Sequence, residues 1–161
     1  MAIINPSSQS SISDEFLQLA SQIVRDSQSK EGALRAAVSR AYYSVFLTVR
    51  DELFGPDGVR LTTPIRKQLD QKFQRKKKQW PGSHERILFA ITVLAPTAII
   101  RPITLCQQIS LLKEARTCAD YYFTSDNLKD IPYNTWSKYA NEMVALASQL
   151  LPVARKLPPY K

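Results

Sequence analysis

The chain has 161 residues, of which 44% are hydrophobic and 22% are charged, and its formal net charge is +8. These values are typical of one folded globular domain and exclude a disordered or fibrous chain. No segment approaches the ~20 apolar residues of a membrane-spanning helix, and residues 1–11 lack the pattern of a signal peptide. We therefore expect a single cytoplasmic domain at 12–156, with a flexible N-terminus at 1–11 and a proline-rich tail at 157–161.

Cysteine and histidine, the usual soft metal ligands, are scarce in this sequence. Cys106 and Cys118 fall in one expected helix, where a rise of ~1.5 Å per residue places them ~18 Å apart and prevents a disulfide between them. Together with His84, the single histidine, they are too few for a zinc site of known ligand spacing. The sequence predicts no metal site and no cofactor.

The first expected helix begins at Ser11 or Ser13, which can cap it, and ends near Ser27. Asp14 and Glu15 fall in its first turn, where negative charge is favourable. Its apolar stripe consists of Phe16, Leu19, Ala20, Ile23 and Val24. The spacing of that stripe predicts an amphipathic helix.

The second expected helix has the clearest apolar periodicity, with pairs of apolar residues recurring every four positions from Ala33 to Leu53. It should end at the Gly-Pro-Asp-Gly turn of residues 55–58. A charged stretch at 61–79 follows and predicts a short helix with a thin apolar edge made by Ile65, Leu69 and Phe73.

Three further helices are expected at 84–94, capped by Ser83, at 103–123 and at 135–151, with Pro152, Pro158 and Pro159 ending the fold. No strand pattern and no internal repeat occurs. The sequence thus predicts an all-α protein, an antiparallel bundle of four to five helices. The basic stretch would form an insertion between the second and third long helices.

Two arginines lie within otherwise apolar helices. On a helical wheel Arg116 falls inside the apolar stripe of its helix, and Asp120, four residues later, is the natural partner. Arg40 lies in the second helix among small and aromatic residues such as Tyr43. Both arginines either stabilise the bundle by pairing with Asp120 and tyrosine hydroxyls, or form a binding site.

The residues around these arginines resemble a known family. Residues 37–46, Ala-Val-Ser-Arg-Ala-Tyr-Tyr-Ser-Val-Phe, look like the signature of HEPN-domain proteins, small helical bundles of prokaryotic toxin–antitoxin and defence systems. Residues 111–121, which end in Arg116 to Tyr121, look like the Arg-x-x-Ala-Asp-Tyr segment of one branch of that family. The resemblance covers residues 12–156 and implies a HEPN-like bundle, a homodimer and a nucleotidyltransferase antitoxin as partner.

The resemblance also implies metal-independent RNA cleavage, for which HEPN ribonucleases use an Arg, a spacer of four to six residues and then a His. Here the corresponding positions are Tyr121, Tyr122 and Phe123, so the standard ribonuclease site is incomplete. Tyr121 should also point ~140° away from Arg116, whereas Asp120 lies only ~40° away. Candidate catalytic residues, should catalysis occur, are Arg116, Asp120, Tyr121 and His84, the last because its side chain titrates near neutrality.

Most of the positive charge is concentrated in one segment. Nine Lys or Arg and two acidic residues lie between Arg60 and Arg86, which gives +7 of the total +8. The run Arg75, Lys76, Lys77 and Lys78 followed by Trp80 combines cations with an aromatic ring, a pattern typical of nucleic-acid binding. A solvated charged face or a surface for an acidic protein are the other interpretations.

We therefore expect a HEPN-like protein that binds RNA or another nucleotide, through Arg40, Tyr43, Arg116 and Asp120, without standard ribonuclease activity. The alternatives are a non-enzymatic helical interaction module that binds an acidic protein, and a ribonuclease that uses non-standard residues.

Overall fold

The computed structural model describes residues 11–26, 28–55, 71, 83–93, 102–121 and 135–157. They form five helices and contain no strand: α1 (Ile12–Arg25), α2 (Glu31–Phe54), α4 (Ser83–Val93), α5 (Pro102–Tyr121) and α6 (Trp136–Ala154). The prediction of an all-α bundle is confirmed. Apart from residue 71, which is helical, the predicted basic helix at 61–79 lies outside the described residues.

Capping residues define the ends of several helices. Ser11 caps α1 by accepting a hydrogen bond from the Asp14 backbone N–H, and Asp14 and Glu15 occupy the first turn as expected. The C-cap residue of α2 is Gly55, whose φ is 77°. A residue with a Cβ atom would be strained at this backbone angle, so the position suits glycine. Thr135 caps α6 in the same way as Ser11 caps α1.

The end of α6 differs from the prediction. Pro152 was expected to end the helix, but α6 continues through it to Ala154. A proline removes one backbone donor and crowds the preceding turn, which is least costly near a helix end. Leu151 and Ala154, on either side of Pro152, are buried in the core, and this burial favours the helical conformation.

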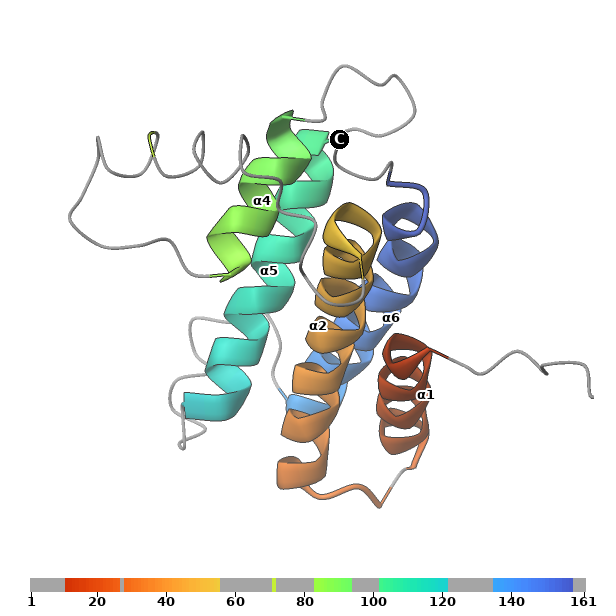
Figure 1. Cartoon of the computed structure of the whole chain (residues 1–161). Coiled ribbons are helices and arrows are strands. Elements are labelled where there is room, and N and C mark those ends of the chain that lie inside the picture. Colours follow the sequence, from red (N-terminus) through yellow and green to blue (C-terminus); the bar gives the residue numbers. More distant parts are fainter. Residues whose placement is uncertain are drawn as a thin grey trace, which may run out of the picture.

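The central element of the fold is α2, which packs against each of the other four helices (Figure 1). Its core residues Val38, Ala41, Val45 and Val49 have no exposed surface. Burial on both flanks explains why its sequence is apolar nearly all round, in contrast to the one-sided stripe of a surface helix. The described helices include none long and apolar enough to cross a membrane.

Contacts near the helix ends fix the directions of the helices. Arg155 at the end of α6 pairs with Asp14 at the start of α1, so these two helices are antiparallel. Arg35, near the start of α2, contacts both Trp136 at the start of α6 and Ala119 at the end of α5. Therefore α5 runs against α2, whereas α6 runs in the same direction as α2 (Figure 1).

The apolar stripe predicted for α1 is only partly buried. Ala20 is fully buried and Ile23 and Val24 pack against the core, but Leu19 is 39% exposed. Ser13 is buried instead. The helix is short and contacts α2 and α6 along one edge, so the outermost residue of its stripe stays in solvent.

Candidate functional site

Arg116 and Asp120 of α5 form the ion pair that their spacing predicts. Arg116 Nε lies 2.6 Å from Asp120 Oδ2, and the two side chains are 22% and 30% exposed. The buried Nε–H is not aligned for a hydrogen bond, so the attraction is mainly that of two charges. Arg116 is therefore held in place by Asp120, with its Nε buried although the side chain as a whole is 22% exposed.

Two tyrosine rings flank this guanidinium. The Arg116 Cζ atom lies 5.5 Å from the ring centre of Tyr43 on α2 and 5.7 Å from that of Tyr121. The helical wheel places Tyr121 ~140° from Arg116, yet the two side chains approach each other. Tyr121 is the last residue of α5, and two long side chains can meet across a turn although their Cβ atoms diverge.

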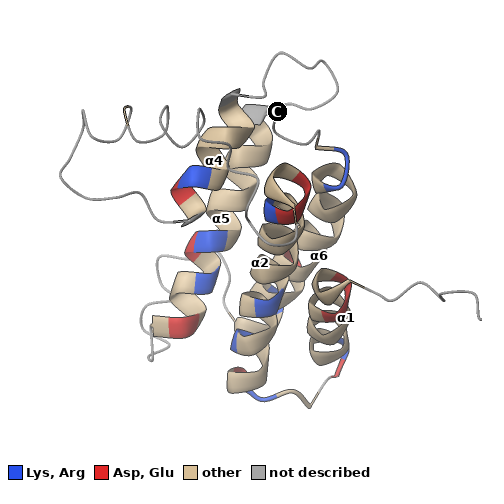
Figure 2. Ribbon diagram, in the orientation of Figure 1, with Lys and Arg blue, Asp and Glu red and all other residues tan. Residues whose placement is uncertain are grey.

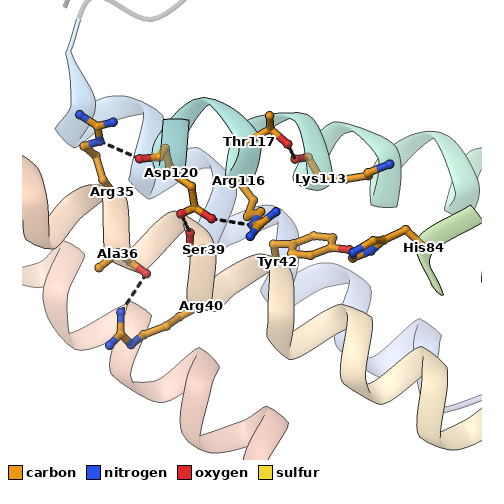
Figure 3. A network of polar contacts seen from close by, with 11 residues as sticks. Arg35, Ala36, Ser39, Arg40, Tyr42, His84, Lys113, Arg116, Thr117 and Asp120 are labelled. Carbon is orange, nitrogen blue, oxygen red and sulfur yellow. Dashed lines mark hydrogen bonds and ion pairs between the residues drawn. The ribbon is translucent and has the colours of Figure 1, made fainter. Parts of the chain in front are cut away.

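Ser39 of α2 connects the ion pair to the neighbouring helix, a role that the sequence analysis missed. Its hydroxyl donates to Asp120 Oδ1, whereas Arg116 Nε pairs with Oδ2 (Figure 3). The periodicity of α2 could have indicated this contact, because Arg35, Ser39 and Tyr42 lie on one helical face, at positions i, i+4 and i+7.

Arg40 does not join this cluster. Its side chain leaves α2 on the side away from Asp120, and its Nη1 donates to the carbonyl oxygen of Ala36, 3.2 Å away (Figure 3). The expected inter-helix site of Arg40, Arg116 and Asp120 is therefore wrong with respect to Arg40. Successive residues of a helix project ~100° apart, so Ser39 and Arg40 face different neighbours.

His84, in the first turn of α4, reaches the same region from a third helix. The Tyr42 hydroxyl of α2 contacts His84 Nδ1, and the imidazole stacks near the ring of Phe46, with ring centres 4.5 Å apart. The Tyr42 ring lies between Arg116 and the imidazole of His84 (Figure 3). The Lys113 side chain extends along α5 toward the imidazole. An isolated histidine at a helix start is usually a surface residue, and only the packing of α4 on α2 and α5 brings this one into the cluster.

The local electrostatics keep His84 neutral and Tyr42 protonated. Burial lowers the pKa of His84, and the positive charges of Lys113 and Arg116 lower it further. Burial, with a smaller contribution from Tyr43, raises the pKa of Tyr42, although Arg116 opposes that rise. Tyr42 therefore donates its proton to Nδ1, which leaves Nε2 as the N–H donor of the neutral imidazole.

The charged residues of α5 all lie in its C-terminal half, after an uncharged first half (Figure 2). Lys113 and Arg116 lie one turn apart, with Asp120 one turn further on. The exposed Glu114 projects from a different face of the helix. Within the described residues the cluster of Lys113, Arg116, Asp120 and neutral His84 thus carries a net positive charge.

Arg35 forms a second polar contact between α2 and α5, and the sequence analysis did not single it out. Its Nε donates to the Ala119 carbonyl oxygen, 2.8 Å away, and its Cζ lies 5.1 Å from the centre of the Trp136 ring. Its Nη1 lies 3.3 Å from Glu31. An open hollow of about 410 Å³ adjoins it and is lined by Glu31, Gly32, Arg35, Ala36, Ala119 and Asp120.

The predicted nucleic-acid segment of Arg75, Lys76, Lys77, Lys78 and Trp80 lies outside the described residues. Within the described ranges no three His, Cys, Asp or Glu side chains lie close enough to hold a metal ion together. Comparison of the chain with protein families, curated proteins and solved structures finds no match.

Proposed function

We propose that this protein is a HEPN-like binder of RNA or another nucleotide ligand, and that Arg116 contacts the phosphate. The observation that carries the proposal is the environment of Arg116, whose side chain is 22% exposed and paired with Asp120, and whose guanidinium is flanked by Tyr43 and Tyr121. A fixed guanidinium presents paired donors to phosphate oxygens, and exposed aromatic rings stack on bases.

Exposure supports a role for Tyr121 in base stacking. Its side chain is 62% exposed, which is unusual for a large aromatic residue that serves only in packing. The basic run at Arg75–Lys78 and Trp80 would add contacts to the nucleic-acid backbone, which supply affinity without sequence preference.

The proposal does not include standard HEPN ribonuclease activity, because Tyr121, Tyr122 and Phe123 occupy the positions where the family motif requires a histidine. The resemblance supports a homodimer, a nucleotidyltransferase antitoxin as partner, and a role in a prokaryotic toxin–antitoxin or defence system. These parts of the proposal rest on the two sequence segments at 37–46 and 111–121.

A titration with fluorescently labelled single-stranded RNA at several salt concentrations tests the proposal. We expect micromolar binding at low salt that weakens as salt rises, and at least tenfold weaker binding for Arg116→Met. The matched control is Arg25→Met, which removes the same charge from an exposed position at the end of α1. Absence of binding at low salt, or equal effects of the two variants, would contradict the proposal.

One observation favours a different function, a non-enzymatic interaction module. Asp120 already engages both Arg116 and Ser39, an arrangement that would also serve to join α2 and α5. In that case the ligand of the basic segment would be an acidic protein, and Arg116→Met would impair stability and leave RNA binding unchanged.

Another observation favours a ribonuclease with non-standard residues, because His84 shares a cluster with Arg116 although it comes from another helix. Incubation of the labelled RNA with the wild type and with His84→Gln separates this function from simple binding. Cleavage that the variant loses would establish a catalytic histidine.

A further inference from the structure

Building on the proposed function, we infer that the open hollow between α2 and α5 receives a nucleobase of the bound RNA and selects guanine through the carboxylate of Glu31. The hollow has a volume of about 410 Å³, within the roughly 300–1,000 Å³ of pockets that hold small ligands. Asp120 lines it and also pairs with Arg116, so the hollow adjoins the proposed phosphate contact.

The walls of the hollow suit a flat ring. Gly32 and Ala36 lie one turn apart on α2, and Ala119 of α5 completes this part of the lining. Figure 3 shows Ala36 and Asp120 at the same end of the interface between the two helices. A Cβ atom on Gly32 would meet nothing within 4 Å, so the space beside it is open. The small side chains thus leave an apolar recess that a base can cover.

The charges of the lining are balanced, which argues against a cationic ligand. Arg35 Nη1 lies 3.3 Å from Glu31 Oε1, and Arg116 Nε lies 2.6 Å from Asp120 Oδ2. Each carboxylate thus has an arginine beside it. A cation gains little net attraction from such a set, whereas a neutral ligand with N–H groups can still use the carboxylate lone pairs that remain.

Glu31 is the carboxylate better placed to accept hydrogen bonds from a ligand. Both oxygens of Asp120 are engaged, Oδ1 by Ser39 and Oδ2 by Arg116. The Glu31 side chain is 49% exposed, and its contact with Arg35 involves Oε1. An ionised carboxylate has about four acceptor sites, so this one contact leaves most of them for a ligand. Because it donates no hydrogen bond, the carboxylate favours a base edge with adjacent donors.

Guanine is the RNA base that presents two adjacent donors, its N1–H and its 2-amino group, on the Watson–Crick edge. Adenine and cytosine each place a ring-nitrogen acceptor beside the amino group, and uracil has a carbonyl oxygen on each side of its N–H. Such acceptors face a carboxylate unfavourably, because neither group supplies a proton. Proteins recognise the unstacked bases of single-stranded RNA at these edges, so Glu31 favours guanine.

The experiment compares fluorescently labelled oligouridine octamers that carry one central guanosine, inosine, adenosine, cytidine or uridine. All five have the same length and charge, so nonspecific attraction to the backbone is the same. Inosine retains the N1–H of guanosine but lacks the 2-amino group. We expect the guanosine octamer to bind about tenfold more tightly than the inosine and uridine octamers, since a paired contact to one base edge gives discrimination of this size.

Glu31→Gln tests the carboxylate. Glutamine has the same size but replaces one acceptor oxygen with an amide donor, so the guanosine and inosine octamers should bind the variant equally. Glu142→Gln is the matched control, because it removes the same charge from an exposed position of α6, and it should retain the preference for guanosine. Loss of the preference in both variants, or in neither, would overturn the role of Glu31.

Gly32→Leu tests the hollow by filling its open space. Leucine is a better helix former than glycine, so the urea midpoint should not fall. The guanosine octamer should nevertheless bind about tenfold more weakly, at the level of the uridine octamer. A retained preference would show that the base does not occupy the hollow. Equal binding of all five octamers by the wild type would overturn this inference alone, whereas absence of all RNA binding would overturn the proposed function as well.

Discussion

The interface of α2 and α5 contains two arginine clusters that differ in how completely their charge is balanced. At the start of α2, Arg35 is satisfied by a carbonyl oxygen, a carboxylate and an aromatic face, and its side chain is 13% exposed. One turn further along α2, Ser39 meets Arg116 of α5, and both side chains contact the one carboxylate of Asp120.

This difference indicates a division of roles. The last carbonyl groups of a helix carry partial negative charge and lack partners within the helix. The last turn of α5 contains no basic residue of its own, so Arg35 supplies this complement from α2. Arg116, in contrast, is 22% exposed and pairs with Asp120 of its own helix. We therefore expect Arg35 to matter most for stability, whereas Arg116 is the arginine that we propose as the ligand contact.

Removal of Arg35 should have the largest effect on stability. Arg35→Met loses a charge-assisted hydrogen bond to Ala119 and the contact with Trp136, while its largely exposed pair with Glu31 contributes little. We expect the free energy of unfolding to fall by about 2 kcal/mol in urea titrations. RNA affinity measured well below the unfolding transition should not change, and a loss of affinity equal to that of Arg116→Met would erase the distinction between the two clusters.

Arg116→Met should show the opposite pattern. Methionine retains the apolar stem, so the stability loss should stay below about 1 kcal/mol, while RNA affinity falls at least tenfold, or about 1.4 kcal/mol. Circular dichroism and the RNA titration on the same sample check both numbers. If the variant unfolds, Arg116 stabilises the fold as Arg35 does, and the contrast between the two arginines is lost.

Ser39→Ala should weaken the connection between the two helices at the binding cluster. Asp120 loses its hydrogen bond from α2, which costs about 1 kcal/mol for a charged acceptor that can turn toward solvent. The less restrained carboxylate should also hold Arg116 less firmly and weaken RNA binding a few fold. Ser21→Ala is a control, because that hydroxyl bonds to a backbone carbonyl of its own helix.

The pH dependence of stability provides the smallest and most specific effect. In the folded protein the pKa of His84 is below its ordinary value of 6.5, so the unfolded chain binds a proton more readily. The contribution of neutral His84 is present above pH 6.5 and is lost as the pH falls toward the folded pKa. Urea midpoints at pH 7.5 and pH 5.5 should differ more for the wild type than for His84→Gln. An equal decrease in both proteins would place the pH sensitivity elsewhere.

The sequence was sufficient for the local parts of the site but not for the parts that depend on packing. The pair of Arg116 and Asp120 follows from their spacing of four residues on one helix, and the structure contains it. Arg40, like Arg116, lies within an otherwise apolar helix, yet its side chain donates to the carbonyl oxygen of Ala36 in its own helix. The position of Arg40 within the segment 37–46 did not indicate which neighbouring helix each face of α2 would contact.

The amino-acid sequence by itself determined the helical class, a serine cap of α1 at Ser11 or Ser13 and the ion pair of α5, because capping and periodicity act over one or two turns. Only the tertiary structure decided that α6 runs parallel to α2, that Arg35 completes the end of α5, and that His84 lies beside Tyr42. These features depend on how the helices pack, and contacts between residues 42 or 84 positions apart leave no local pattern in the chain.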